Sequence, residues 1–439
     1  MCSERILHAL KPEIGGLLLK IGRDCAICAC MLYRLEIENF YSIRDPQILD
    51  LRVPKSVPDF PERFASIFPH SEERVAKAIA LFGPNGSGKS TVLRALAFAS
   101  WFLRESFQHK GPGLPCERFN DEESANREIR LAIELGGLLD LSGSPRTAED
   151  LTTADDVGTL RYELHLQPKD GVIRTVSHEA LRMKRKGQGK WQRVFERGAD
   201  RSVHGSKMFP LAGFSQVVDK IREDASVVST LALFEHQASK VLSEAAAAVF
   251  RNILIDRTDP GDQAAIQYFA QSPDAVAALN RELQRIDIGV EEMHIVQVAT
   301  GPLALFKHQG LHVDMPWGLE SHGTRSFIRI FPLILLALQR GGVAVIDELD
   351  QSIHPLILPE IVRWFYDPDR NPHNAQLWMS CHSASLLDDL TKEEVVFCDK
   401  DSCGRSQVYS LMDVGAVRRT DNLYKKYLGG VYGAVPQVG

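Results

Sequence analysis

A glycine-rich octapeptide, GPNGSGKS at Gly83–Ser90, has the residue types and the spacing of a phosphate-binding loop. Its glycines let backbone N–H groups converge on phosphate oxygens, the Lys89 amine reaches the β- and γ-phosphates, and the Ser90 hydroxyl is a ligand for Mg²⁺. A glycine-rich helix start without a ligand is the alternative. The residues predicted to contact a nucleotide are Gly83, Pro84, Asn85, Gly86, Ser87, Gly88, Lys89, Ser90 and Thr91.

Two consecutive acids follow a short apolar run in GGVAVIDELD at 341–350. This pattern is typical of a buried parallel strand whose carboxyl end meets the phosphates. We expect Asp347 to orient the Mg²⁺ shell and Glu348 to hold or polarise the attacking water. Acids after a strand often only cap the next turn, so the phosphate loop is what favours the catalytic interpretation.

A third apolar strand with a polar tip is predicted in QLWMSCHSASLLDDL at 376–390, where the tip is His382 with Ser383. A lone histidine is usually a structural or surface residue. Because His382 comes 35 residues after Asp347 and ends a core strand, it is placed to hydrogen-bond a γ-phosphate or the attacking water.

Small polar residues open a strongly apolar helix in GLESHGTRSFIRIFPLILLALQRGG at 318–342. Ser321 and Gly323 at such a helix start can form an anion site, because the first N–H groups and the positive end of the helix dipole are exposed. An ordinary N-cap is the alternative interpretation.

Strand, turn and helix are expected around the phosphate loop. MLYRLEIENFYSIRD, from Met31, alternates apolar and polar residues like a half-exposed strand, and VAKAIALF at 75–82 is apolar enough for a buried one. Residues 105–126 are predicted to form a loop. The segment at 91–103 predicts an amphipathic helix with one apolar face, formed by Val92, Leu93, Leu96, Ala99 and Leu103.

Later segments differ in pattern. Short strand-like runs separated by turns predict an antiparallel subdomain over 127–215, alanine-rich helical spacing follows to about 290, and strands and helices then resume together. The predicted units are an N-terminal extension at 1–30, an ATPase lobe at 31–126, the antiparallel subdomain at 127–215, a helical insertion at 216–291 and a second ATPase lobe at 292–439.

The composition is that of a folded globular chain of 439 residues, with 44% hydrophobic and 25% charged residues and a net charge of −6. The longest uncharged apolar run, Ile330–Leu338, is nine residues long, against roughly 20 for a transmembrane helix. We therefore expect no membrane span. A nucleic-acid contact would need a local basic patch.

Eight scattered cysteines favour a reducing cytoplasm over a disulfide scaffold. Three of them form CAICAC at 25–30, but no second ligand pair at zinc spacing accompanies them, so no metal site is expected there. Charged residues interrupt the first 30 residues, which argues against a secretory signal. We interpret 1–30 as an extension upstream of a natural start at Met31.

The interval from Lys89 to Asp347 is 258 residues, which is too long for a compact AAA+ module without a large insertion. The order of these motifs resembles that of ABC-type ATPase heads of the SMC-like and OLD-like group. Within it, the chain looks most like bacterial AAA-family ATP-binding proteins of abortive-infection and other antiphage systems. The resemblance runs from Met31 to about Pro436. It rests on LEIENFYSIRD (35–45), GPNGSGKST (83–91), ESHGTRS (320–326), IDELDQSIHPLILPEIVRWF (346–365), LWMSCHSASLLD (377–388) and RRTDNLYKKYLGGVYGAVP (418–436).

The resemblance implies an α/β P-loop NTPase fold: an ABC-type head with a mixed core sheet, an antiparallel β subdomain and a helical insertion. It implies that ATP and Mg²⁺ bind, with Lys89 and Ser90 on phosphate and metal and Asp347 in the Mg²⁺ site. Glu348 would be the catalytic base and His382 the switch histidine.

Ser321 and Gly323 match the signature loop, which in ABC-type heads contacts nucleotide bound to the opposite subunit. ATP would then join two heads into a homo-oligomer, and Asp350 and Ser352 would lie in the loop that crosses the interface. ESHGT departs from the transporter-type LSGGQ. No Q-loop residue is assigned, although 118–120 lies in the corresponding region.

The implied function is ATP hydrolysis (an EC 3.6 activity) with self-association around ATP that regulates a separate effector, such as a nuclease or a Toprim-like protein, in antiphage defence. A fused Toprim domain is not expected, because only 57 residues follow His382. The alternative is a DNA-binding SMC-like ATPase of DNA repair or maintenance. It is supported by LRMKRKGQGKWQRVFERGADR at 181–201, which has eight basic and two acidic residues.

Overall fold

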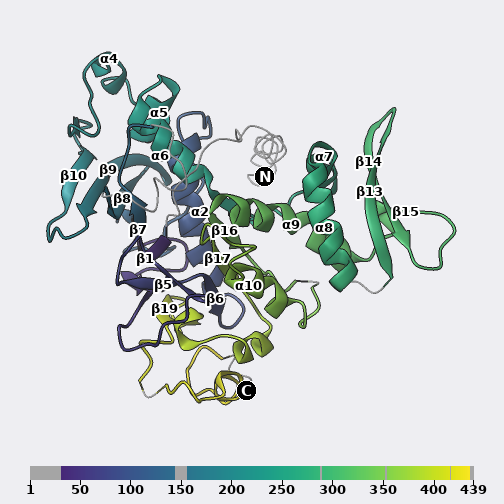
Figure 1. Cartoon of the computed structure of the whole chain (residues 1–439). Coiled ribbons are helices and arrows are strands. Elements are labelled where there is room, and N and C mark those ends of the chain that lie inside the picture. Colours follow the sequence, from purple (N-terminus) through teal and green to yellow (C-terminus); the bar gives the residue numbers. More distant parts are fainter. Residues whose placement is uncertain (1–30, 144–155, 287–288, 352, 416, 436–439) are drawn as a thin grey trace.

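The computed structural model describes residues 31–143, 156–286, 289–351, 353–415 and 417–435 (Figure 1). Two large sheets and the helices between and around them form the body of the described chain. A smaller sheet of β3 (Arg52–Val53), β5 (Arg74–Ala76) and β4 (Phe64–Ser66) packs beside them.

The first large sheet has seven strands, all antiparallel, and contains the strands predicted for 127–215. From Tyr33 onward, alternate side chains of β1 are buried, as expected for a strand with one face on a core. Because β7 pairs with β1, segments 31–126 and 127–215 share one sheet. Across the sheet the strands are β11 (Val203–Gly205), β10 (Gln192–Arg197), β9 (Val172–Arg185), β8 (Val157–Lys169), β7 (Ile129–Leu138), β1 (Met31–Glu38) and β2 (Gln47–Asp50).

The second large sheet has six strands and is parallel except for its last pair. In β6, Ile79 and Leu81 face one core while Ala78, Ala80 and Phe82 face the other, so the strand is buried on both faces. In order, the strands are β12 (Val249–Arg251), β16 (Val343–Ile346), β17 (Gln376–Ser380), β6 (Ala78–Phe82), β18 (Val395–Lys400) and β19 (Ser406–Ser410).

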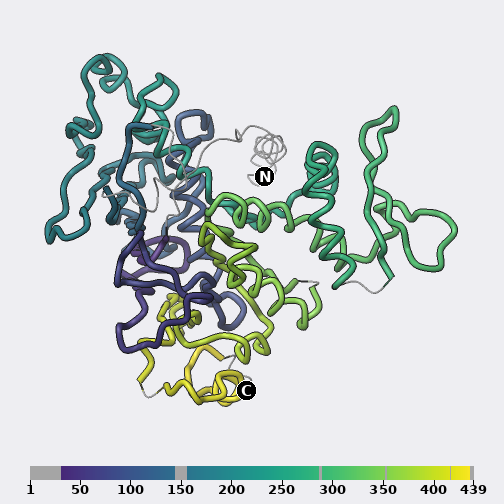
Figure 2. The backbone as a smooth tube through the Cα atoms, viewed as in Figure 1, coloured from purple at the N-terminus to yellow at the C-terminus, as the bar shows by residue number. Residues whose placement is uncertain are grey.

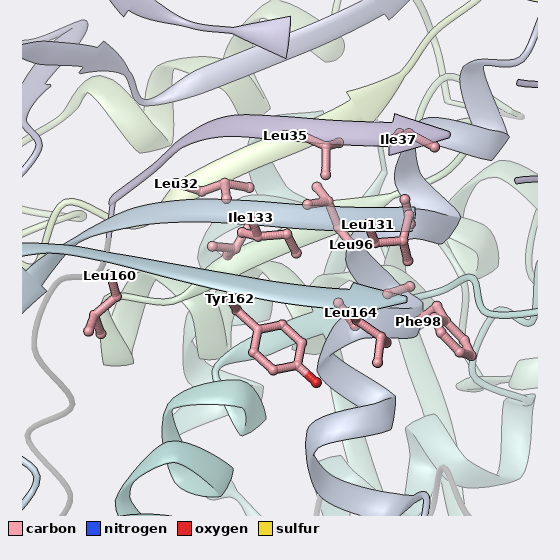
Figure 3. Packing of buried hydrophobic residues seen from close by; sticks show 14 of the residues in the cluster. Leu32, Leu35, Ile37, Leu96, Phe98, Leu131, Ile133, Leu160, Tyr162 and Leu164 are labelled. Carbon is pink, nitrogen blue, oxygen red and sulfur yellow. The ribbon is translucent and has the colours of Figure 1, made fainter. Parts of the chain in front are cut away.

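Helix α2 (Lys89–Glu105) lies between the two large sheets, and α5 (Val227–Leu233) and α6 (Gln237–Ala247) pack against it. Figure 3 shows Leu96 and Phe98 of α2 facing the inward side chains of β1, β7 and β8. The helix is buried on nearly every side, so the predicted single apolar face was too narrow. A second sheet covers the side on which solvent was expected.

The opposite face of the parallel sheet is covered by α9 (His322–Arg340) and α10 (Leu358–Tyr366). Ser321 caps the start of α9, and Gly341, with φ of 74°, ends it in the left-handed conformation. Helices α7 (Asp262–Gln271) and α8 (Pro273–Ile286) separate α9 from a three-stranded sheet of β13 (Val290–Val298), β14 (Gly301–His308) and β15 (Met315–Pro316), as the tube in Figure 2 shows.

Two sequence-based expectations about strands were wrong in detail. The single strand expected at 75–82 is divided at Lys77 into β5 and β6, which belong to different sheets. Strand β12 lies inside the region expected to be helical, because pairing with β16 outweighs the local helical pattern. The remaining short elements are α4 (Ser215–Val218), η1 (Trp317–Leu319), η2 (Ala384–Asp388), η3 (Lys392–Glu394) and α11 (Leu423–Leu428).

Candidate nucleotide-binding site

The glycine-rich loop follows β6 at the carboxyl edge of the parallel sheet and leads into α2. Gly83 has φ of 148°, and a Cβ there would lie 2.1 Å from the Cys398 carbonyl oxygen. Gly88 has φ of 108° and no room for a Cβ beside Ser406. No side chain caps the start of α2, so its first N–H groups remain free to bind an anion.

Lys89 is 5% exposed and donates hydrogen bonds to the carbonyl oxygens of Gly83 at 2.8 Å and Pro84 at 3.0 Å. Burial lowers the pKa of its amine, which the acids across the cleft partly offset. A buried cation held only by carbonyl oxygens is suited to a phosphate, which would supply the missing opposite charge.

Asp347 follows β16 and is buried behind the loop. Its Oδ1 accepts hydrogen bonds from the hydroxyls of Ser90 at 3.0 Å and Ser380 at 2.6 Å. Carboxylate and hydroxyl oxygens are the hard donors that Mg²⁺ prefers. The residues present therefore fit Mg²⁺, with Ser90 and Asp347 as the groups that would hold it.

Glu348 occupies the turn after Asp347 with φ of 51°, a rare conformation for a residue with a side chain. Its N–H donates to Ser380 Oγ at 2.7 Å. One carboxylate oxygen lies 3.7 Å from His382 Nε2, and the other accepts a hydrogen bond from Arg257 at 2.8 Å. The structure thus brings Glu348 and His382 together and adds Arg257, which sequence reasoning missed.

Asp350 fixes the turn that carries His382. Its Oδ2 accepts hydrogen bonds from the N–H groups of His382 at 2.8 Å and Ser383 at 2.6 Å. Ser352, the other residue expected in this loop, lies outside the described residues.

A cleft of about 1330 Å³ opens over these groups, above the roughly 300–1,000 Å³ of most small-molecule sites. Residues 85–91, Glu348 and His382 line it. So do residues 118–120, the segment that the sequence placed in the Q-loop region.

Tyr41, Ser42 and Arg94 also line the cleft but were not predicted as site residues. The Arg94 guanidinium lies 5.0 Å from the centre of the Tyr41 ring, and Ser42 Oγ is 3.0 Å from Thr91 Oγ1. Burial raises the pKa of Tyr41. Both Tyr41 and Ser42 belong to LEIENFYSIRD, whose aromatic and hydroxyl residues just after a strand were the available signal.

Ser321 and Gly323 do not line this cleft. Ser321 is exposed at the start of α9, where its Oγ accepts the Thr324 N–H at 3.1 Å. Its own N–H donates to Glu320 Oε1 at 2.7 Å, and Glu320 also contacts His308 Nε2 at 2.8 Å. The predicted anion site of α9 is therefore separate from the phosphate loop within one chain.

Among the described residues, no helix is long and apolar enough to cross a bilayer. The same part of the chain contains no group of three His, Cys, Asp or Glu side chains arranged for a metal ion. The CAICAC segment lies outside it.

A parallel sheet with a phosphate loop after one strand and an Asp–Glu pair after another defines a P-loop NTPase, which confirms the predicted fold class. Residues 78–196 and 250–388, more than half of the chain, match the family described as "AAA domain, putative AbiEii toxin, Type IV TA system". The chain belongs to this family, which confirms the predicted resemblance to AAA-family ATP-binding proteins.

Several solved SMC head domains are similar in structure. The SmcHead bound to the C-winged helix domain of ScpA has a TM-score of 0.45 and 11% identity, covering 86% of this chain and 97% of that one. The SMC head domain of Thermotoga maritima has a TM-score of 0.38 and 12% identity, and the match covers 87% of this chain and 98% of that one. A third structure is the Pyrococcus furiosus Smc head with an extended coiled coil, bound to the C-terminal domain of ScpA. It has a TM-score of 0.41 and 11% identity, and the match covers 92% of this chain and 99% of that one. No curated protein matches the chain.

Proposed function

We propose that this protein binds ATP with Mg²⁺ in the cleft and hydrolyses it. The observation that carries the proposal is the convergence of Lys89, Ser90, Asp347, Glu348 and His382 at one edge of one sheet, although they come from distant parts of the chain. A phosphate loop alone supports binding; an acid and a histidine opposite it support hydrolysis.

In the proposed reaction a water molecule attacks the γ-phosphorus, and the bond from that phosphorus to the β–γ bridging oxygen breaks. Glu348 accepts the proton of the water, His382 donates a hydrogen bond to the γ-phosphate or holds the water, and ADP with phosphate leaves. Mg²⁺ held by Ser90 and Asp347 would neutralise charge on the phosphate oxygens. Lys89 and the free N–H groups of α2 hold those oxygens in place.

We further propose that two copies associate around ATP, with Ser321 and Gly323 of one copy against the nucleotide of the other. Support comes from the exposure of Ser321 at a helix start outside the cleft of its own chain. The family description names a toxin and a toxin–antitoxin system, which supports a role in antiphage defence. Regulation of a separate effector, in the cytoplasm, is part of the same proposal.

The test is the light-scattering mass of Glu348→Gln with and without Mg-ATP. We expect ATP to remain bound and the mass to double, and we expect an added Ser321→Arg to prevent the increase. Ser56→Arg, at an exposed serine of the β3–β4 loop, is the matched control and should leave the increase intact. A mass that stays at that of a single chain while ATP is bound would reject association around ATP.

A second candidate function, DNA contact, is supported by the β9–β10 hairpin. Half of the basic residues at 181–201 are engaged within the chain: Arg182 and Arg185 pair with carboxylates, while Arg197 and Arg201 donate to backbone carbonyls. The tip carries four that form no ion pair within the described residues: Lys184, Lys186, Lys190 and Arg193.

Replacing Lys186, Lys190 and Arg193 by glutamate should weaken duplex DNA binding and flatten its salt dependence by about one unit of slope per lost phosphate contact. Fluorescence anisotropy across a salt series measures both. Arg281→Glu, at an exposed position of α8, is the control. Equal affinity in the triple variant would rule the hairpin out.

A further inference from the structure

The loop between β12 and α7, residues 252–261, lies beside the turn that carries Asp347 and Glu348. Asn252 at its start accepts the Asp347 N–H at 2.8 Å and donates to the Asp347 carbonyl oxygen at 3.1 Å. The same amide donates to Asp259 Oδ1 at 2.8 Å. Asn252 therefore ties the edge strand of the sheet to the acidic turn and to the far end of its own loop.

Arg257, in the middle of this loop, bridges two carboxylates. Its Nε and Nη2 donate to the two oxygens of Asp259 at 3.2 and 2.6 Å, and its Nη1 donates to Glu348 Oε2 at 2.8 Å and to Gln351. The Arg257 side chain is 19% exposed, so the pair is partly shielded from water. Glu348 cannot turn this oxygen toward another part of the cleft without breaking the ion pair.

The residue that follows this loop contacts α9, the helix that begins after Ser321. Asp262, the first residue of α7, accepts a hydrogen bond from Arg329 Nη1 at 3.1 Å, and its other oxygen lies 3.8 Å from Arg325 Nη1. Both arginines are in the first half of α9. A shift of the α9 start would therefore pull on Asp262, five residues from Arg257.

We propose that Arg257 is a positioning residue that restrains Glu348. We further propose that the 252–261 loop, moved through Asp262, releases this restraint when a second copy contacts the start of α9. The inference rests on the proposed roles of Glu348 and α9. It adds a physical reason for hydrolysis to depend on assembly: in the separate chain both oxygens of the Glu348 carboxylate already have a neighbour, Arg257 on one side and His382 on the other.

The test is the ATP hydrolysis rate per chain at saturating Mg-ATP, measured from dilute to concentrated protein. In dilute protein, Arg257→Gln should hydrolyse about fivefold faster than the original chain, which corresponds to about 1 kcal/mol of barrier at 1.36 kcal/mol per tenfold, with KM for ATP unchanged. A loss of structure would slow hydrolysis, so an increase identifies a restraint. Asp262→Asn should flatten the rise in rate per chain with protein concentration.

Arg281→Gln is the matched control and should behave like the original chain. Asp259→Asn, which removes the second carboxylate from Arg257, provides an independent variant and should change the rate in the same direction by a smaller factor. A rate in dilute protein that is unchanged or reduced in both Arg257→Gln and Asp259→Asn would overturn the inference. Undiminished hydrolysis by Glu348→Gln would instead overturn the proposed role of Glu348, so the two failures are distinguishable.

Discussion

At the scale of single residues, Lys89 is under two opposing demands. Burial disfavours its charge and lowers its pKa, yet the residue is placed where a phosphate would require that charge. The carbonyl oxygens of Gly83 and Pro84 hold the amine in the meantime. Binding of a polyanion therefore removes an electrostatic cost that the separate protein carries.

Lys89→Ala should weaken Mg-ATP binding by about 10- to 100-fold, the equivalent of one charge-assisted hydrogen bond of ~1.5–3 kcal/mol. Titration calorimetry measures the affinity, and the increase in melting temperature on adding Mg-ATP should be lost with it. Lys55→Ala, at an exposed lysine, is the control. Equal affinity in Lys89→Ala would contradict the proposed site.

Gly88→Ala should destabilise the chain more than Gly187→Ala. Both glycines have positive φ, 108° and 78°, but a Cβ at Gly88 would lie 2.5 Å from Ser406 Oγ while one at Gly187 would contact nothing. We expect Gly187→Ala to lower the free energy of unfolding by about 1 kcal/mol from backbone strain alone. Gly88→Ala should lower it by a further ~1–3 kcal/mol. Urea unfolding measures the difference, and equal losses would show that the loop rearranges freely.

At the scale of elements, an ion-pair network covers part of one face of the antiparallel sheet. Arg161 of β8 contacts Glu36 of β1, Glu134 of β7 and Glu163 of its own strand. Glu163 in turn contacts Arg182 of β9. Hydrogen bonding by His178 and by the two arginines holds the pKa of Glu163 well below its usual range, although burial opposes this.

Glu163→Gln should lower the free energy of unfolding at pH 7 by about 1 kcal/mol and by less at pH 3. Because the folded pKa of Glu163 lies below its unfolded value, its stabilising effect is present above the unfolded pKa of about 4.3 and fades as the pH falls below it. Urea unfolding at both pH values tests this. Glu122→Gln, at an exposed carboxylate, should show no such dependence.

The sequence predicted the elements whose own pattern defines them. The phosphate loop, the strands of 127–215 and the start of α9 at Ser321 were located from local residue types and spacing. Strand β12 was not, because its three residues lie within an alanine-rich run and become a strand only by pairing with β16. Asn252 and Arg257 were missed for the same reason: their partners are about 90 residues away, and no local motif marks them.

At the scale of the whole molecule, α2 links the nucleotide-binding site to both large sheets. It carries Lys89 and Ser90 at its start, and its apolar side chains belong to a core cluster that contains residues of both large sheets. Figure 3 shows the side of this helix that packs on the antiparallel sheet. The two sheets therefore share a single buried helix. A substitution that destabilises this helix should therefore destabilise the antiparallel sheet and the nucleotide site together.

Phe98→Ala should lower the free energy of unfolding by about 3–5 kcal/mol. Both sheets should still unfold together, in one transition shifted to lower urea concentration. Far-ultraviolet circular dichroism and tryptophan fluorescence should report coincident urea midpoints. Leu103→Ala, at a half-buried position of the same helix, should cost less. Separate midpoints for the two probes would show that the sheets unfold independently.

Strand β6 has a consequence for synthesis of the chain. It lies between β17 and β18, yet its last residue, Phe82, precedes Gln376 of β17 by 294 residues. At roughly 5–20 residues per second, the ribosome needs about 15–60 s to deliver that partner. Throughout this interval a nascent chain already carries the complete phosphate loop on a strand with two unpaired edges and apolar side chains on both faces. Protection of that strand during translation, by a chaperone or by the first sheet, is thus a requirement of this topology.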